Sequence, residues 1–314
     1  MRKVLILTDL KGWHYDQLVR SFNKFGILVE SACLDQLSIK ILNDRIRLYL
    51  EDKELTGFTD VFVRHVPGGT LEQVVVNLNI LKVFERMDIN VMNSSENIET
   101  TVDKSLTSIM LNRANILTPN TWIFRDINEA KDEANILLKK LKLIYKPLFG
   151  SQGDNIVKIN DIKDFDKVIN DTRIYYLQEF IETLPSHDYR ILVIKKGDDY
   201  LTYTMARYGS TYVNNYSKGG KCLSVEIDDD LKSIAIDAAK VIGIPFCGVD
   251  IIKSNNKIYV IEINSIPAWR GMQSINEVNI SDNIVSSFLD GDGKKFRVST
   301  VSYTHLTLPT NREV

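Results

Sequence analysis

The sequence predicts a protein of mixed α/β and α+β class, with a small parallel-sheet domain followed by two α+β units. Three observations support this prediction. The chain has 314 residues, more than one domain usually contains. Up to about residue 95, apolar strand-like segments alternate with helix-like segments, and the pattern then changes. Within residues 246–264, two apolar strands flank a short polar turn, as in an antiparallel hairpin.

The first unit is expected to span residues 1–95. Its predicted strands lie at residues 4–7, 27–32, 61–64 and near 91, and its predicted helices at 15–25 and 71–87. Gly26 follows the first helix as a stop signal. Strands separated by helices usually pair in parallel, so we expect one small parallel sheet.

The second unit is expected to span residues 96–184, after a linker rich in Ser, Asn and Glu that starts near residue 93. A glycine-containing loop separates two of its strands, which predicts an α+β unit. The expected helices lie at 104–114, 127–141 and 162–169, and the expected strands at 121–124, 143–146, 156–159 and 174–180.

The third unit is expected to span residues 185–296, with strands at 189–194 and 201–206, a helix at 231–242 and the hairpin. The helix keeps its apolar positions on one face, and Gly243 and Pro245 follow it as stop signals. Residues 301–310 resemble the translation of a sequencing adapter. We therefore interpret residues 297–314 as a non-native tail and exclude them from fold reasoning.

The hairpin carries three polar residues, Asp250, Glu262 and Asn264, where apolar residues are expected. Glu262 and Asn264 are two residues apart and share a strand face. Asp250 joins that face only if paired residue numbers sum to an even value, which requires an odd-length loop or a bulge. A two-residue turn at Asn255 and Asn256 would therefore break the site.

Two carboxylates and an amide oxygen form an all-oxygen ligand set, which suits magnesium and also admits manganese. Ionised acids without a positive partner inside a covered hairpin would destabilise the fold by about several kcal/mol, as buried unpaired charges do. The alternative interpretation is a buried acid paired with an arginine. The set of three oxygen ligands on one hairpin favours the metal.

A second chemical feature is Lys146 at the end of a predicted strand, followed by a loop with glycines at 150 and 153. Glycines let backbone amides approach a polyphosphate and let the loop close as a lid. The loop matches neither the P-loop nor the dinucleotide-binding fingerprint. An ordinary hairpin turn is the alternative.

Composition excludes several classes of function. The formal net charge of -2 gives no support for nucleic-acid binding. Three scattered cysteines and four scattered histidines indicate neither a disulfide framework nor a zinc site. No apolar run approaches membrane length. We expect a soluble, cytoplasmic protein without a membrane partner. The sequence does not decide whether the protein forms a homo-oligomer.

Taken in order, seven motifs resemble the RimK-type branch of the ATP-grasp ligases, over most of residues 1–296. They are Asp103-Lys104, Lys146-Pro147, Gly150-Ser151-Gln152-Gly153, Gln178-Glu179-Phe180-Ile181, Asp188-x-Arg190, Gly248-Val249-Asp250 and Glu262-Ile263-Asn264. The resemblance implies an ATP-grasp fold. Residues 1–95 would form the pre-ATP-grasp domain, and residues 96–184 and 185–296 would form two α+β lobes enclosing ATP.

The resemblance also implies roles for the motif residues. Lys104 and Lys146 would contact phosphates, and Ser151, Gln152 and Gly153 would close over them. The remaining nucleotide contacts would come from Gln178, Glu179, Phe180 and Ile181 at the adenine edge, Asp188 near the ribose, and Arg190 and Asn215. The magnesium ligands of the family correspond to Asp250, Glu262 and Asn264.

The implied reaction has two steps. A bound carboxylate attacks the γ-phosphate to give an acyl phosphate and ADP, and an amine then displaces phosphate. Arg207 is the candidate for stabilising the developing charge, with Lys146 and Asn215 as further catalytic residues. A surface arginine is the alternative for Arg207. A kinase and a non-catalytic ATP-binding module remain alternative functions.

The substrates are expected to be L-glutamate and a carboxylate-bearing small molecule. The segments around Arg64 and Trp269 look most like glutamate ligases associated with tetrahydromethanopterin, and Arg64, Lys218, Trp269 and Arg270 are the substrate candidates. Trp269 could stack on a flat ring and Arg270 could bind a carboxylate, with a packed Trp and a solvated Arg as alternatives. Departures from the better-known pattern at residues 213–220 and Ala268 disfavour a ribosomal-protein tail. A protein tail or carrier protein stays the alternative acceptor.

Overall fold

The computed structural model describes residues 2–43, 45–150, 154–168, 172–209, 221–225 and 229–291. Several predicted features lie outside these residues, namely Ser151, Gln152, Gly153, Asn215, Lys218 and the tail at 297–314.

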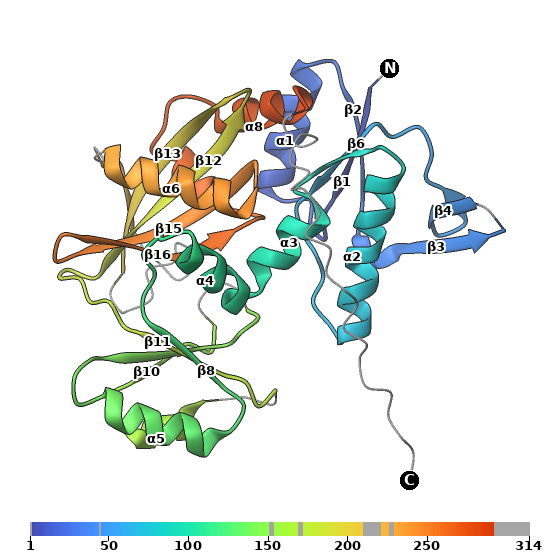
Figure 1. Cartoon of the computed structure of the whole chain (residues 1–314). Helices are drawn as coiled ribbons and strands as arrows, with labels where there is room; N and C mark the ends of the chain where they lie inside the picture. Colours follow the sequence, from blue (N-terminus) through green and yellow to red (C-terminus); the bar gives the residue numbers. More distant parts are fainter. Residues whose placement is uncertain are drawn as a thin grey trace, which may run out of the picture.

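The N-terminal domain contains the predicted parallel sheet, with strand order β2-β1-β6-β7 (Figure 1). Its core strand is buried on both faces, because Val4 and Ile6 pack into one apolar cluster while Leu5 and Leu7 pack into another. The elements are β1 (Lys3–Leu7), α1 (Trp13–Lys24), β2 (Leu28–Ala32), β6 (Asp60–Val63), α2 (Leu71–Arg86) and β7 (Asn90–Met92).

A small antiparallel sheet projects from this domain and was not predicted (Figure 1). It consists of β3 (Leu37–Leu42), β4 (Arg45–Leu50) and β5 (Lys53–Glu54), after the short 3-10 helix η1 (Leu34–Gln36). Leu37 and Leu48 anchor it in the N-terminal core. The apolar residues alternate on both long strands, which is the signal that could have revealed the hairpin.

The predicted polar linker near residue 93 is wrong, because the chain there forms the helix α3 (Ser95–Val102), which leads into the predicted helix α4 (Lys104–Arg113). Ser94 caps the first helix by accepting a hydrogen bond from the Asn97 amide at 3.1 Å. The buried Asn97 side chain donates to the carbonyl of Ile242 at 3.2 Å. The polar residues therefore serve as helix caps and as contacts between units.

The central lobe is an antiparallel sheet of order β10-β9-β11-β8, which lies apart from the N-terminal sheet in Figure 1. One face is covered by α5 (Ile127–Leu137) and by η2 (Ile162–Lys167), which is a 3-10 helix rather than the expected longer helix. The strands are β8 (Thr121–Phe124), β9 (Leu143–Lys146), β10 (Val157–Ile159) and β11 (Tyr175–Glu179).

The C-terminal lobe is an antiparallel sheet of order β14-β13-β12-β15-β16. One face packs on α6 (Asp229–Ile242), which ends before Gly243 at a φ of 72°. The remaining elements are β12 (His187–Lys196), β13 (Asp199–Tyr208), β14 (Lys221–Leu223), β15 (Phe246–Ser254), β16 (Lys257–Asn264), α7 (Arg270–Gln273) and α8 (Ile280–Leu289). No helix in the described part of the chain combines the length and apolar character needed to cross a membrane.

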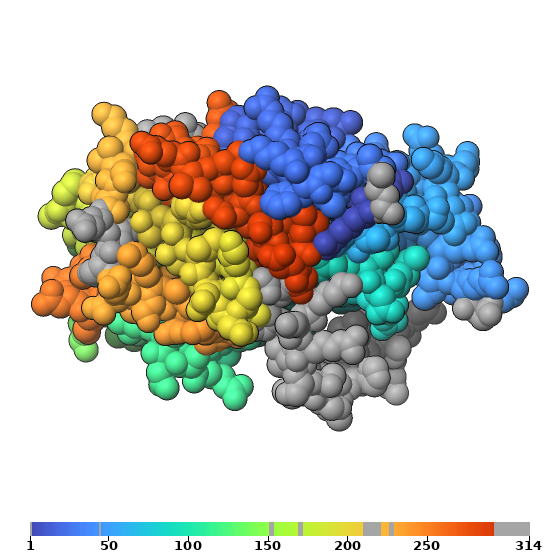
Figure 2. Space-filling model, turned by 90° about the horizontal axis from the view of Figure 1, so that it is seen from above, coloured from blue at the N-terminus to red at the C-terminus, as the bar shows by residue number. Residues whose placement is uncertain are grey.

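The N-terminal domain and the C-terminal lobe share one apolar core. Phe62 of the N-terminal domain packs with Phe246 and Phe288 of the C-terminal lobe, with ring centroids 6.3 and 5.4 Å away. Figure 2 shows the blue N-terminal segments lying against the red segment that contains α8. Ser21 on α1 also donates a 2.7 Å hydrogen bond to Asp282 on α8. These contacts fix the first unit relative to the C-terminal sheet.

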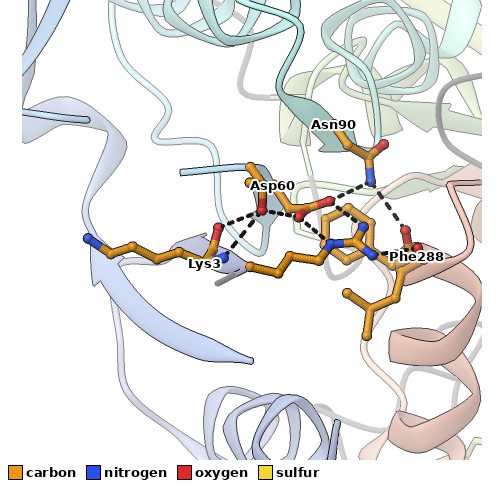
Figure 3. A network of polar contacts seen from close by, with 7 residues as sticks. Lys3, Asp60, Asn90 and Phe288 are labelled. Atoms are coloured by element: carbon orange, nitrogen blue, oxygen red, sulfur yellow. Dashed lines mark hydrogen bonds and ion pairs between the residues drawn. The ribbon is translucent and has the colours of Figure 1, made fainter. Parts of the chain in front are cut away.

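A buried polar network closes this interface around Asp60 (Figure 3). The Asp60 carboxylate accepts two 2.7 Å hydrogen bonds from Arg2 and one of 3.1 Å from Asn90. Arg2 and Asn90 also donate to the carbonyls of Leu289 and Phe288 at the end of α8. The network thus ties the edge of the parallel sheet to the C-terminal helix.

Replacing Asp60 with Ala is expected to lower the free energy of unfolding by about 3 kcal/mol, the low end for a broken buried ion pair, because Arg2 stays partly hydrated. Burial opposes ionisation of Asp60, but hydrogen bonds from Arg2 and its neighbours lower its pKa below the usual value. The contribution is therefore present above about pH 4 and lost at lower pH. Urea unfolding checks this, with exposed Asp132→Ala as control. Equal midpoints for both variants would contradict it.

Candidate functional site

A β-bulge places the three predicted metal ligands on one face of the hairpin. Ser254 pairs with Lys257 across a two-residue turn, and a straight ladder from that turn would pair Asp250 with the residue before Glu262. The register shifts between residues 250 and 251, so Asp250 faces Glu262 and Gly248 faces Asn264. The expectation that a two-residue turn would break the site is wrong, because the bulge restores the alignment.

Asp250 is a buried acid held by two arginines. It is 3% exposed, and it accepts 2.7 and 2.6 Å hydrogen bonds from Nε and Nη2 of Arg190. Arg207 Nη2 lies 3.0 Å from the same carboxylate. Burial alone would raise the pKa of Asp250, but the two guanidiniums outweigh it and lower the pKa. The alternative of an acid paired with arginine therefore holds for this residue.

Arg207 joins a second buried carboxylate to this network. Its Nε donates a 2.6 Å hydrogen bond to Asp188, and Arg207 itself is 2% exposed. This excludes the alternative of a surface arginine. Asp188, expected near the ribose, pairs with Arg207, and Arg190 pairs with Asp250.

The residues present fit a hard divalent cation. Within the described residues no lysine or arginine forms an ion pair with Glu262. The buried Asn264 amide nitrogen has no hydrogen-bond partner there and would suit a phosphate oxygen, whereas the amide oxygen would be the cation ligand. Asp250 Oδ1 accepts only the Arg190 Nε hydrogen bond there, which leaves one lone pair for a ligand. In the described ranges no group of three or more His, Cys, Asp or Glu side chains is arranged to hold a metal ion.

Two lysines of the central lobe lie close enough to Glu262 to interact with its charge, and one of them, Lys104, lines a small pocket together with Glu262. Burial lowers the pKa of Lys146 to about 8, and attraction to Glu262 opposes that shift. Burial likewise lowers the pKa of Lys104, again opposed by Glu262. Lys104 Nζ also donates to the Gly150 carbonyl at 3.0 Å, at the start of the glycine loop. The fold therefore brings both predicted phosphate contacts close to Glu262, one of the predicted metal ligands.

The Gln178 side chain positions Lys146. Gln178 is 2% exposed, and its Oε1 accepts a 2.7 Å hydrogen bond from Lys146 Nζ. Its Nε2 donates to the Tyr176 hydroxyl at 3.1 Å, and that hydroxyl is 2.9 Å from the Ser108 hydroxyl. Sequence reasoning placed Gln178 at the adenine edge, whereas this side chain is directed to the lysine.

A cavity of about 490 Å³ lies beside the connection from β11 to β12. Its lining includes Glu179, Phe180 and Ile181, which are the other predicted adenine contacts, together with Tyr259. Tyr259 pairs with Ile252 on the neighbouring strand. Ile252 is two residues from Asp250, so the two side chains share a strand face, about 7 Å apart. The cavity and the carboxylates therefore lie on the same face of the hairpin.

Trp269 lies in the protein core. It is 0% exposed, its indole N–H donates to Ser281 at 3.0 Å, and its ring packs against Phe246. The packed-Trp alternative is therefore correct, and stacking on a substrate ring is not. Arg64 lies over the Trp269 ring at 5.0 Å, and Arg270 is exposed.

Sequence reasoning missed His14, and it did not identify Arg190 and Arg207 as the arginines that pair with Asp250. His14 contacts Trp269, since its Nε2 accepts the Trp269 backbone N–H at 3.1 Å. A lone histidine at the start of α1 gave no signal in the sequence. The spacing of Asp188 and Arg190 revealed a motif, but it did not reveal that the arginine reaches across to β15.

Comparison with known proteins identifies the family. The RimK-like ATP-grasp domain profile matches residues 101–288. A tetrahydromethanopterin:alpha-L-glutamate ligase of Methanococcus maripaludis is 25% identical over 294 residues, covering 91% of this chain and 97% of the relative. The ligase of that name from Methanocaldococcus jannaschii is 32% identical over 212 residues, covering 64% and 70%. A probable alpha-L-glutamate ligase of Thioalkalivibrio sulfidiphilus is 28% identical over 307 residues, covering 96% and 99%.

Solved structures show the same fold. The ATP-grasp ligase PsnB complexed with minimal precursor has a TM-score of 0.69 at 17% identity, covering 93% of this chain and 98% of that one. A RimK domain protein of Sphaerobacter thermophilus has a TM-score of 0.69 at 15% identity, covering 91% and 98%. The chain belongs to the RimK-like ATP-grasp family and is an ATP-grasp ligase. The predicted family and fold class are confirmed.

Proposed function

We propose that the protein is an ATP-dependent carboxylate-amine ligase that joins L-glutamate to a carboxylate acceptor through an acyl phosphate, releasing ADP and phosphate. The observation that carries the proposal is the convergence of Asp250, Glu262 and Asn264 on one face, with Lys104 and Lys146 opposite. Such a site binds a nucleotide triphosphate through its phosphates and a divalent cation.

Each group has a defined part in the proposal. Magnesium or manganese held by Asp250, Glu262 and Asn264 would screen the phosphate charge. Lys104 and Lys146 would bind the phosphate oxygens, and the cavity near Phe180 would hold the adenine. A related PsnB complex contains Mg and ADP.

Arg207 is the proposed stabiliser of the acyl phosphate. Asp188 and Asp250 hold its guanidinium rigidly, so its direction is fixed before the substrate arrives. Within the described residues these carboxylates engage Nε and Nη2, and a guanidinium has five N–H donors. The remaining donors can bind the oxyanion that develops when an amine attacks the acyl carbon.

The acceptor that we propose is a tetrahydromethanopterin-type coenzyme. The support is the name shared by two of the relatives, one of which covers 91% of this chain. The test is mass spectrometry after incubation with ATP, magnesium, L-glutamate and candidate pterins. Addition of one or more glutamyl units with stoichiometric ADP is expected. Release of AMP, or phosphate retained on the product, would reject the ligase reaction, and glutamylation of a peptide or carrier protein alone would reject the pterin.

The affinity for ADP with magnesium is expected to fall above about pH 8, by up to about tenfold per pH unit. In the protein without nucleotide, Lys146 loses its proton above this pH, because its pKa is lowered to about 8. A bound phosphate favours the protonated form of the lysine. Below that pH the lysine is charged in both states and the affinity is constant. Calorimetry from about pH 7 to about pH 9.5 checks this.

The control for this prediction is Lys146→Arg, which keeps its charge across the range and should flatten the profile. A wild-type affinity that stays constant through pH 9 would contradict the assignment of Lys146 to the phosphates.

A further inference from the structure

Arg64 is a half-buried cation that forms no ion pair with any of the residues that the structure describes. It follows β6 at the carboxyl end of the parallel sheet, an edge where open α/β sheets bind ligands. Its Nη1 donates to the carbonyl of Pro267 at 2.9 Å, and its guanidinium lies over the Trp269 ring. Within the described residues no carboxylate forms an ion pair with it, and Asp9 acts only at longer range. A guanidinium in such surroundings usually meets an anion.

A second arginine adds to the positive charge at this point. Arg270 is exposed, and both Arg64 and Arg270 lie close enough to His14 to affect its ionisation. Burial, followed by these two charges, lowers the pKa of His14 to about 3, so the ring is neutral at physiological pH. His14 does not act as a general base, because its Nε2 lone pair already accepts the Trp269 backbone N–H. The cluster of Arg64, Arg270 and His14 is therefore cationic.

The cluster borders the phosphate end of the nucleotide site. The carbonyl that holds Arg64 belongs to Pro267, and Pro267 packs on Gly248 so closely that an added Cβ would meet it at 3.1 Å. The same Cβ would lie 3.8 Å from the Arg190 side chain, which binds Asp250. Gly248 and Asp250 share a strand face and lie about 7 Å apart. A substrate bound at the cluster could therefore reach the acyl phosphate.

We propose that Arg64 and Arg270 form a carboxylate subsite that holds the incoming L-glutamate beside the acyl phosphate; this inference rests on the proposed ligase function. Glutamate carries two carboxylates, and two guanidiniums from different domains suit it. The positive surroundings also favour the neutral form of its amine, which is the form that attacks. The acceptor also carries a carboxylate and is the other possible source of this chemistry.

The experiment compares wild type with Arg64→Gln, Arg64→Lys and Arg270→Gln. L-Glutamate binding is measured by calorimetry in the presence of ADP and magnesium, and KM values are measured for glutamate, acceptor and ATP. Arg64→Gln is expected to weaken glutamate binding and raise its KM about 10-fold to 100-fold, the range for one charge-assisted hydrogen bond. Arg64→Lys should recover part of this. The exposed Arg125→Gln is the charge-matched control and should leave both unchanged.

ADP binding by each variant shows that the protein is folded. L-Glutamine, which lacks the side-chain carboxylate, should bind the wild type more weakly than L-glutamate does. Its affinity should also fall less than that of L-glutamate in the Arg64→Gln variant. A raised KM for the acceptor with an unchanged KM for glutamate would assign the same subsite to the acceptor carboxylate. If Arg64→Gln and Arg270→Gln leave both KM values and glutamate binding unchanged while ligation proceeds, the subsite is rejected. Glutamate binding without ligation to any acceptor would instead reject the proposed function.

Discussion

Replacing Glu262 with Gln is expected to reduce ATP turnover at least about 100-fold, the loss typical of removing one group that stabilises transition-state charge. Glu262 is the carboxylate of the site that no arginine or lysine pairs with in the described part of the chain, whereas Asp250 is already bound by two arginines. An amide at this position keeps the size of the side chain and removes its charge. Both cation binding and the position of the triphosphate should suffer.

The measurement is ADP release in a coupled assay, together with Mn²⁺ binding followed by electron paramagnetic resonance in the presence of ADP. Both signals should fall together. Glu277→Gln, on the surface, is the matched control and should behave as wild type. Wild-type Mn²⁺ affinity in Glu262→Gln would remove this residue from the ligand set, even if activity were lost.

The hairpin shows how far sequence reasoning reached into the site. Strand periodicity placed Glu262 and Asn264 on one face, and the parity of the register showed that Asp250 needed a bulge or an odd loop to join them. The structure meets this condition with the bulge. The turn itself is a two-residue turn, in which Asn255 and Asn256 have φ values of 50° and 58°. Local spacing could therefore state the condition but could not choose how the chain meets it.

The charge partners of the site could not be read from the sequence. Arg190 and Arg207 lie on β12 and β13, and their pairing with Asp250 depends on strand order and on which faces meet. Sequence distance carries no information about such contacts. For the same reason Trp269 was a candidate for substrate stacking, although the packing of α8 and β15 encloses it completely.

The fold was easier to predict from the sequence where the structure of a segment depends on its own residues. Apolar runs in β1 and β6 predicted the parallel sheet, because both faces of these strands are buried. The segment that forms α3 was wrongly predicted as a linker, because its Ser and Asn residues act as caps and buried contacts of a helix. Polar composition alone does not separate a linker from a helix that docks through polar groups.

Replacing Arg207 with Gln is expected to lower the free energy of unfolding by about 3–5 kcal/mol, the usual cost of leaving buried carboxylates uncompensated. Asp188 would lose the charge partner at 2.6 Å, and Asp250 would keep only Arg190. Urea unfolding, with the midpoint and slope compared to wild type, measures this loss. Activity should also disappear, but stability separates the structural role from the catalytic one.

The double variant Asp188→Asn with Arg207→Gln tests the charge argument directly. If the loss comes from an unpaired carboxylate, removing the Asp188 charge as well should recover part of the stability, so the double variant is less destabilised than the two single variants added together. Arg207→Lys keeps the charge but cannot reach two carboxylates with one planar fork, so an intermediate loss is expected. A wild-type unfolding midpoint for Arg207→Gln with activity abolished would mean that the arginine serves only the reaction. An additive double variant would mean that its packing, and not its charge, supports the sheet.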